Sequence, residues 1–210
     1  MASSRLQVGI DVPWVTSWSA EVMAGVGPCS TVLGRLALSQ LERPGDGKPQ
    51  YSQNHLRRQR QSVRDMLCPM CGAPTASNDR WTLTARRATL GALRSRAPQM
   101  HAPADIPDDR IVIDAGAIAP LHRTCLDRSL THCPHLRGRD DTEAMAFPAT
   151  WLVAPLMAEP PAPAAYLAAP LAQPVIAFLQ IIGLTEERDA GGRRRADTKD
   201  RPQEAPGPSH

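Results

Sequence analysis

Two cysteines separated by two residues, and followed at once by glycine, are the residues of this sequence best suited to chemistry. They lie in the segment Cys68-Pro69-Met70-Cys71-Gly72. In a tight turn this spacing points both thiolates at one metal ion, and the glycine lets the backbone fold back beneath that ion. The segment therefore predicts one half of a zinc site, in the form of a zinc knuckle.

The other half of the site must come from the histidines and cysteines that follow the knuckle. Zinc takes four ligands at about 2.0–2.3 Å, so its ligand sulfurs lie within about 4 Å of one another. Cys125 and Cys133 cannot easily share one ion, because eight residues of helix rise ~12 Å. The candidates after the knuckle are His101, His122, Cys125, His132, Cys133 and His135.

His122 and Cys125 have the required spacing of two intervening residues. They also lie where a loop is expected to enter a helix, and the positive end of the helix dipole favours a thiolate there. We therefore predict one structural Zn²⁺ site formed by Cys68, Cys71, His122 and Cys125.

Two alternatives to this ligand set stay open. In one, Cys133 or His135 replaces His122. In the other no site forms, and Cys125 and Cys133 are ordinary buried thiols. The segment Cys133-Pro134-His135 is otherwise expected to end a helix and to pack the Cys133 thiol into the core. The alternatives are that this thiol is reactive or that it makes a secondary metal contact. Cys29 has no partner in the pattern and is expected to be a small apolar filler.

The helix that leads into the knuckle is predicted over residues 52–67. Ser52 is a candidate N-cap at its start. Leu56, Val63 and Leu67 recur on one face. Arginines and glutamines fill the other faces.

Beyond the knuckle, residues 81–84 and 111–113 have strand character, and a helix is expected over residues 124–132. The order is then a knuckle, two strands and a ligand pair that opens a helix, which is the order of a treble clef. The fold class predicted is α+β: a small treble-clef or zinc-ribbon-like domain over residues 51–140, with short strands and two helices. The gap of about 50 residues between the half-sites is long for this fold.

The flanking segments are predicted to be less regular. Residues 1–50 are read as an irregular arm, within which residues 31–41 could form a short strand or a helix. Trp14 and Trp18 are expected to anchor this arm onto the domain, and the alternative is an exposed binding motif. Residues 85–109 are read as a long, poorly ordered excursion. The charged tail over residues 186–210 is expected to be disordered.

An apolar region rich in proline and alanine is predicted over residues 141–185. Its strand-like pieces are residues 150–154 and 175–182, and the second piece is alternatively a helix with Pro174 at its first position. Prolines interrupt the region repeatedly, and its last apolar piece is about half the ~20 residues of a membrane span. The sequence therefore predicts no membrane segment.

Composition favours a modest core that a metal reinforces. Only 4% of the 210 residues are aromatic, and 21 are proline. The N-terminus has no basic region followed by an apolar stretch and a cleavage site, so no secretory signal is predicted. Five cysteines are an odd number. Together with the knuckle, this favours a metal site in a reducing cytoplasm over a disulfide framework.

Positive charge is concentrated around the first half-site. The net charge is +3, yet residues 50–100 carry nine arginines against Asp65 and Asp79. Such a cluster beside a zinc module is typical of a surface that contacts phosphates, or of a solvated helix face. The arginines nearest the knuckle lie within about two turns of the predicted helix: Arg57, Arg58, Arg60 and Arg64.

Four motifs in order resemble small zinc-knuckle proteins common in Streptomyces and related actinobacteria. They are LRRQR at 56–60, MLCPMCGAP at 66–74, LHRTC at 121–125 and HCPHL at 132–136. In those proteins a basic RRQR helix precedes the knuckle, and a second C-x-x-C opens a helix that ends in C-P-H-L. This sequence has His122 where the family has cysteine, a change that zinc tolerates. The resemblance covers about residues 51–137 and implies a fold and a metal but no activity.

The sequence predicts a protein that is not an enzyme. It has no phosphate-binding Walker loop, no nucleophile elbow and no dinucleotide fingerprint. The His-x-Glu pair of zinc deaminases is absent, since Thr124 stands two residues after His122. The function predicted is a zinc-stabilised interaction module that binds a protein partner, and the alternative is a nucleic-acid-binding zinc protein that uses the arginine-rich helix.

Overall fold

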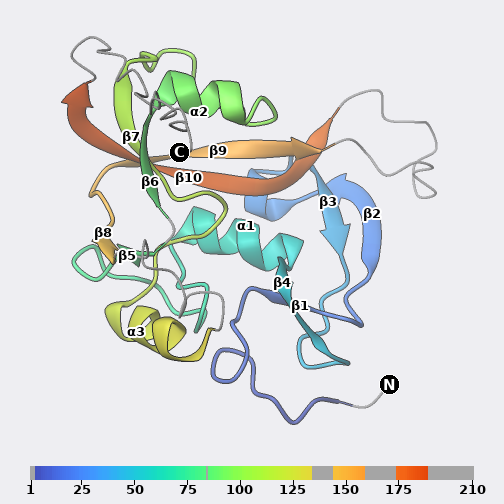
Figure 1. Ribbon diagram of the computed structural model, residues 1–210. Coiled ribbons are helices and arrows are strands. Elements are labelled where there is room, and N and C mark those ends of the chain that lie inside the picture. Colours follow the sequence, from blue (N-terminus) through green and yellow to red (C-terminus); the bar gives the residue numbers. More distant parts are fainter. Residues whose placement is uncertain (1–2, 84, 134–143, 159–173, 189–210) are drawn as a thin grey trace, which may run out of the picture.

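The computed structural model describes residues 3–83, 85–133, 144–158 and 174–188 of the chain (Figure 1). Within them the chain is α+β, as predicted, with three α-helices in place of the two expected. The elements are β1 (Thr16–Trp18), β2 (Met23–Pro28), the short 3₁₀ helix η1 (Ser30–Val32), β3 (Leu36–Gln40), β4 (Pro49–Asn54), α1 (Leu56–Asp65), β5 (Trp81–Thr82), β6 (Arg86–Thr89), α2 (Leu90–Arg96), β7 (Arg110–Asp114), α3 (Arg123–His132), β8 (Met145–Ala146), β9 (Trp151–Ala158) and β10 (Val175–Arg188).

Strand β10 is the centre of the largest sheet. The sheet runs in the order β2-β3-β10-β7-β6, and β9 pairs with β10 outside that path. β10 is parallel to β3 and antiparallel to β7 and β9. Its apolar run from residue 175 to 182 is almost wholly buried, as a strand covered on both faces requires. The two strands predicted near residues 150–154 and 175–182 are therefore present.

Helices cover the two faces of this central strand. Val63 of α1 belongs to a buried apolar cluster with Ile181, whereas Leu93 of α2 belongs to a second cluster with the neighbouring residue Ile182. Successive side chains of a strand point to opposite faces. Helix α1 and helix α2 thus lie on opposite sides of β10 (Figure 1).

The first 50 residues are not an irregular arm, which corrects the prediction. They contain β1, β2 and β3, whose partners lie far along the sequence: β1 pairs with β4, and β3 pairs with β10. Because β3 and β10 lie in one sheet, the N-terminal segment and the segment after residue 141 build one core with the middle of the chain. The predicted boundaries near residues 50 and 140 do not separate these parts.

Two further elements differ from the prediction. Helix α1 begins at Leu56 and not near Ser52, because residues 49–54 form β4 and His55 caps the helix by accepting from the Arg58 amide at 3.4 Å. Residues 85–109 contain β6 and α2, and Thr89 caps α2 by accepting from the Ala92 amide at 3.2 Å. By contrast, β7 and α3 lie where a strand and a helix were expected.

Helix α1 sends charged side chains into the interior, which corrects the prediction of an exposed basic face. Arg58 and Arg60 are each 1% exposed. The guanidinium of Arg58 donates two hydrogen bonds to the buried carboxylate of Glu21, at 2.7 and 2.8 Å, and one to the Thr16 carbonyl at 2.8 Å. Burial alone would raise the pKa of Glu21, but the hydrogen bonds from Arg58 and from the Trp18 amide, together with the positive charge of Arg58, outweigh it, and this pKa lies below its ordinary value.

The next two residues of α1 bind backbone groups of the sheet. The side-chain amide of Gln59 donates to the Leu179 carbonyl at 2.6 Å and accepts from the Leu179 amide at 3.0 Å. Arg60 donates to the carbonyls of Ala177 and Leu38 at 2.7 and 2.9 Å. The RRQR motif therefore holds α1 against β10 and β3 by hydrogen bonds. Its arginines Arg58 and Arg60 are buried and cannot contact a phosphate in this structure.

Arg57 and Arg64 remain at the surface. Arg57 pairs with Glu42 at 3.2 Å. Arg64 pairs with its neighbour Asp65 and donates to the Ser30 carbonyl at 3.0 Å. In the described part of the chain no helix is long and apolar enough to cross a membrane.

Replacing Arg58 by methionine is expected to lower the free energy of unfolding by about 3–5 kcal/mol, because the carboxylate of Glu21 would stay buried without its partner. Arg57→Met is the matched control on the exposed side of the same helix, and we expect it to change stability by less than about 0.5 kcal/mol. Urea denaturation of both variants measures the difference. Similar small losses in the two variants would show that Arg58 is not a core residue.

Candidate metal centre

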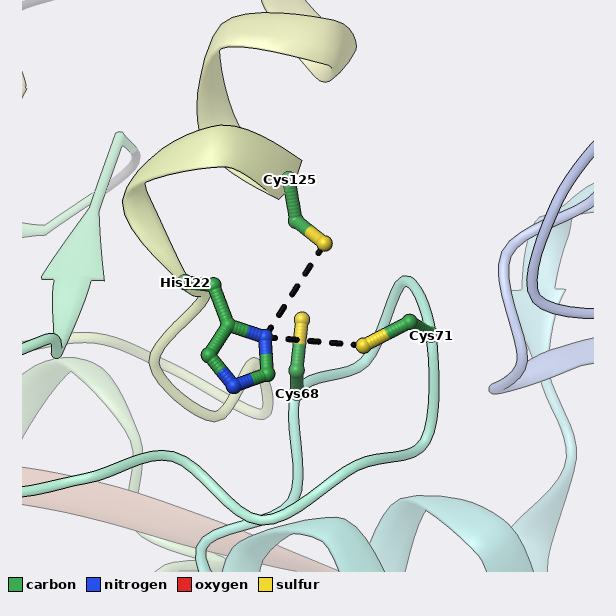
Figure 2. Close-up of side chains that lie close together, drawn as sticks. All are labelled: Cys68, Cys71, His122 and Cys125. Carbon is green, nitrogen blue, oxygen red and sulfur yellow. Dashed lines mark hydrogen bonds between the residues drawn. The ribbon is translucent and has the colours of Figure 1, made fainter.

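The structure brings together the four residues that the spacing selected. The possible ligand atoms of Cys68, Cys71, His122 and Cys125 all lie within 4.8 Å of one another. Figure 2 shows three sulfurs around the imidazole, two from the loop that follows α1 and one from the first turn of α3. Three thiols and one imidazole at this separation can hold a metal ion.

Backbone geometry shapes the knuckle before any metal is considered. Helix α1 ends where Met66 takes a left-handed conformation, with φ 52°. The chain then turns back on itself: the Cys68 amide donates to the Ala73 carbonyl at 2.8 Å, and the Gly72 amide donates to the Cys68 carbonyl at 2.8 Å. Gly72 has φ 77°, a conformation that glycine adopts without strain. The sequence reasoning that assigned the turn to this glycine is confirmed.

A short backbone ladder brings the second pair of residues to the knuckle. Trp81 of β5 and Leu121 exchange two hydrogen bonds, at 2.9 and 2.8 Å. His122 follows immediately as the N-cap of α3, and Cys125 lies in the first turn of that helix. The Arg123 amide donates to Asp79 at 2.8 Å, which fixes the start of the helix against the loop before β5.

This ladder also explains the long gap between the half-sites. The chain leaves the site after β5, and residues 86–114 build β6, α2 and β7 of the large sheet. It returns to β5 only at Leu121. The gap between the two pairs of residues is therefore filled by folded structure of the large sheet.

The tautomer of His122 suits a metal ligand. Its Nε2 lies 3.1 Å from the Pro74 carbonyl oxygen, which can only accept, so Nε2 carries the proton. In the neutral imidazole Nδ1 is then the unprotonated nitrogen, and it faces the Sγ atoms of Cys71 at 3.5 Å and Cys125 at 3.9 Å. A carbonyl partner on the far nitrogen is the usual outer-shell support of a ligating histidine.

Burial makes the thiols costly to ionise without a cation. It raises the pKa of Cys125 to about 12, and the thiols of Cys68 and Cys71 nearby add to the shift. Burial also raises the pKa of Cys68. At Cys71 burial acts in the same direction, but hydrogen bonds outweigh it and this pKa is lowered. A bound cation would displace these protons.

The N-terminal segment packs against the knuckle. The amides of Trp14 and Val15 donate to the carbonyls of Met70 and Pro69, at 2.9 and 3.1 Å. A Cβ placed on Gly72 would come within 2.9 Å of the Trp14 ring, so this ring packs directly on the turn. The prediction that Trp14 anchors the N-terminal segment is confirmed.

The other candidates among the described residues are not part of the cluster. Cys133 caps the far end of α3, after His132, and His135 lies outside the described residues. Cys29 packs against the apolar cluster of α1, as a filler would, but its sulfur also lies 3.0 Å from Thr31 Oγ1 and 3.6 Å from Arg60 Nη2.

Comparisons with family models, with curated proteins and with solved structures each find no match to this chain. The actinobacterial resemblance therefore remains an expectation.

Gly72→Ala is expected to destabilise the protein more than Gly34→Ala. Both glycines have φ near 77–78°, so alanine is strained at either position, by about 1–2 kcal/mol. Only at Gly72 does the new methyl meet the Trp14 ring, whereas at Gly34 it meets nothing within 4 Å. We expect a difference of about 1–3 kcal/mol in urea denaturation. Equal losses would contradict the packing of Trp14 on the knuckle.

Proposed function

We propose that Cys68, Cys71, His122 and Cys125 bind one Zn²⁺ ion as a structural staple. The single observation that carries the proposal is the convergence of three sulfurs and one imidazole nitrogen within 4.8 Å. Soft thiolates with one imidazole are a donor set that zinc prefers, and magnesium and calcium take oxygen donors instead. Zinc chemistry thus fits the residues present.

The proposed ion is structural because its coordination is closed. Four protein ligands fill a tetrahedral zinc ion, and catalysis needs one position open to water or substrate. The site joins the loop that follows α1 to the first turn of α3, two segments far apart in the sequence. We therefore propose that the protein is not an enzyme and that the metal fixes the shape of a surface.

The treble-clef description belongs to the same proposal. Its support is the order of a knuckle, the ladder between Trp81 and Leu121, and a ligand pair that opens α3. In this description residues 86–114 are an insertion between the two strands of the clef. The metal would then close a module whose halves are separated in sequence by α2 and two strands of the large sheet.

Metal analysis of the purified protein is expected to give about one zinc ion per chain. Cys68→Ser and Cys125→Ser should each lose the ion and lower the melting temperature, because zinc binding contributes to folding. Cys133→Ser is the matched control, since its thiol lies outside the cluster. Wild-type protein that is free of metal but fully folded would refute the staple.

We propose further that the module binds a protein partner. The supporting observation is Leu33, at the end of η1 in the connection between β2 and β3. It has φ 56° and is 91% exposed. A bulky apolar residue in the left-handed region costs roughly 1–2 kcal/mol, and local strain of this kind gathers at functional positions. Met23 and Leu36 of the same hairpin are also exposed.

The nucleic-acid alternative has less support than the sequence suggested. Much of the positive charge of residues 50–100 is used within the protein. Arg58 and Arg60 are buried. The arginines with carboxylate partners at or near the surface are Arg57, Arg64, Arg94 and Arg96.

Leu33→Asp is expected to abolish co-purification of a stoichiometric protein partner without loss of stability, because aspartate tolerates the left-handed conformation better than leucine. Tyr51→Asp, at another exposed position on β4, is the control and should retain the partner. The measurement is affinity purification of tagged protein followed by native mass spectrometry. Wild-type protein without a partner, but with strongly salt-dependent binding to random duplex DNA, would favour the alternative.

A further inference from the structure

An open hollow lies between the end of α2, strand β6 and the loop that follows β7, away from the metal centre. Its volume is about 430 Å³, which falls in the range of small-ligand sites. The residues that line it are Arg86, Arg96, Asp114, Ala115, Gly116, Ala117 and Ile118. Two guanidinium groups and one carboxylate thus face a floor of small apolar residues.

The carboxylate of Asp114 is held in place from several directions. Gln180 Nε2 donates to its Oδ1 at 2.8 Å, and the Gly116 amide donates to the same oxygen at 3.0 Å. Its other oxygen pairs with Arg96, the last residue of α2. The side chain of Asp114 is 12% exposed and that of Arg96 is 53% exposed. Asp114 therefore fixes one edge of the Arg96 guanidinium and leaves much of that group open to the hollow.

Arg86 supplies a second positive charge to the hollow. It stands directly opposite Asp114 in the pairing of β6 with β7, so both side chains start from the same face of the sheet. Among the described residues, no hydrogen bond or ion pair is found for the Arg86 side chain. Since the one carboxylate of the hollow is already taken by Arg96, the lining carries a net positive charge.

The floor of the hollow leaves room beside these charges. Gly116 has φ 64°, and a Cβ added to it would meet nothing within 4 Å. Ala117 and Ile118 continue the apolar lining. The Gln59 side chain holds this loop from below by donating to the Ala117 carbonyl at 2.9 Å. The floor is thus fixed to α1, and it would not have to form on binding.

We propose that this hollow binds a small organic oxyanion. The guanidinium groups of Arg86 and Arg96 would receive its charged end, and the floor from Ala115 to Ile118 would receive a small apolar body. Arginine forks match both phosphate and carboxylate oxygens. The shared chemistry of the ligand is therefore a phosphate ester or a carboxylate on an apolar group. This inference goes beyond the zinc staple and the partner surface and does not rest on either.

Titration of the full-length protein with phenyl phosphate and with benzoate, followed by amide NMR, tests the site. We expect saturable shifts of the Gly116 and Ala117 amide resonances with at least one of the two anions, and none with phenol. Arg86→Gln and Arg96→Gln should each weaken binding roughly tenfold or more, because each removes a charge-assisted contact. Tighter binding of phenyl phosphate would identify a phosphate ester as the ligand type, and tighter binding of benzoate a carboxylate.

Arg35→Gln is the matched control, because Arg35 is an exposed arginine at the hairpin between β2 and β3. It should leave the affinity unchanged. Arg86→Gln keeps the pair between Arg96 and Asp114, so its melting temperature should equal that of the wild type. Failure of both anions to give saturable shifts would overturn the proposal. Binding that Arg86→Gln and Arg96→Gln leave unaltered would overturn it as well.

Discussion

Helix α1 carries three consecutive polar side chains into the interior, and the arrangement of the strands around it depends on their partners. Arg58 reaches Glu21, Gln59 reaches the backbone of Leu179, and Arg60 reaches the carbonyls of Ala177 and Leu38. A buried charge or amide left without partners costs several kcal/mol. These partners fix the position of the helix, which joins Glu21 and β3 of the N-terminal segment to β10.

The metal centre follows from where this helix ends. Met66 closes α1 in a left-handed conformation, and the knuckle begins two residues later. Once α1 is fixed against β10, the two knuckle cysteines are fixed as well. The ladder of Trp81 with Leu121 then brings His122 and Cys125 to the same point. In the proposed function zinc locks this junction, so that the insertion over residues 86–114 and the N-terminal cover stay in place around it.

The sequence predicted the site better than the fold because ligand spacing is a local property. Two residues between ligands, and an expected helix start at His122, were sufficient to select the four residues that the structure brings together. Strand β1 was missed because it pairs with β4, which lies far along the chain. Residues 31–41 could be a strand or a helix from the sequence alone, and the pairing of Ala37 with Ile176 in β10 makes their end the strand β3. Strand β2 was missed because its sequence, MAGVGP, contains two glycines and shows little alternation of apolar and polar residues.

The arginines of α1 were misjudged for a related reason, since charge was taken to indicate exposure. One signal did point inward. Leu56 and Val63 define a buried stripe, and Gln59 and Arg60 lie three and four residues after Leu56, within that stripe. Their burial could have been predicted from spacing. The burial of Arg58 could not, because it depends on Glu21 in a distant segment.

X-ray absorption at the zinc K edge, on protein loaded with one equivalent of Zn²⁺, tests the proposed centre most directly. A closed site of Cys68, Cys71, Cys125 and His122 predicts about three sulfur neighbours at ~2.3 Å and one nitrogen neighbour at ~2.0–2.1 Å. A first shell dominated by oxygen or nitrogen, or an absorption spectrum identical to that of zinc in buffer, would contradict it.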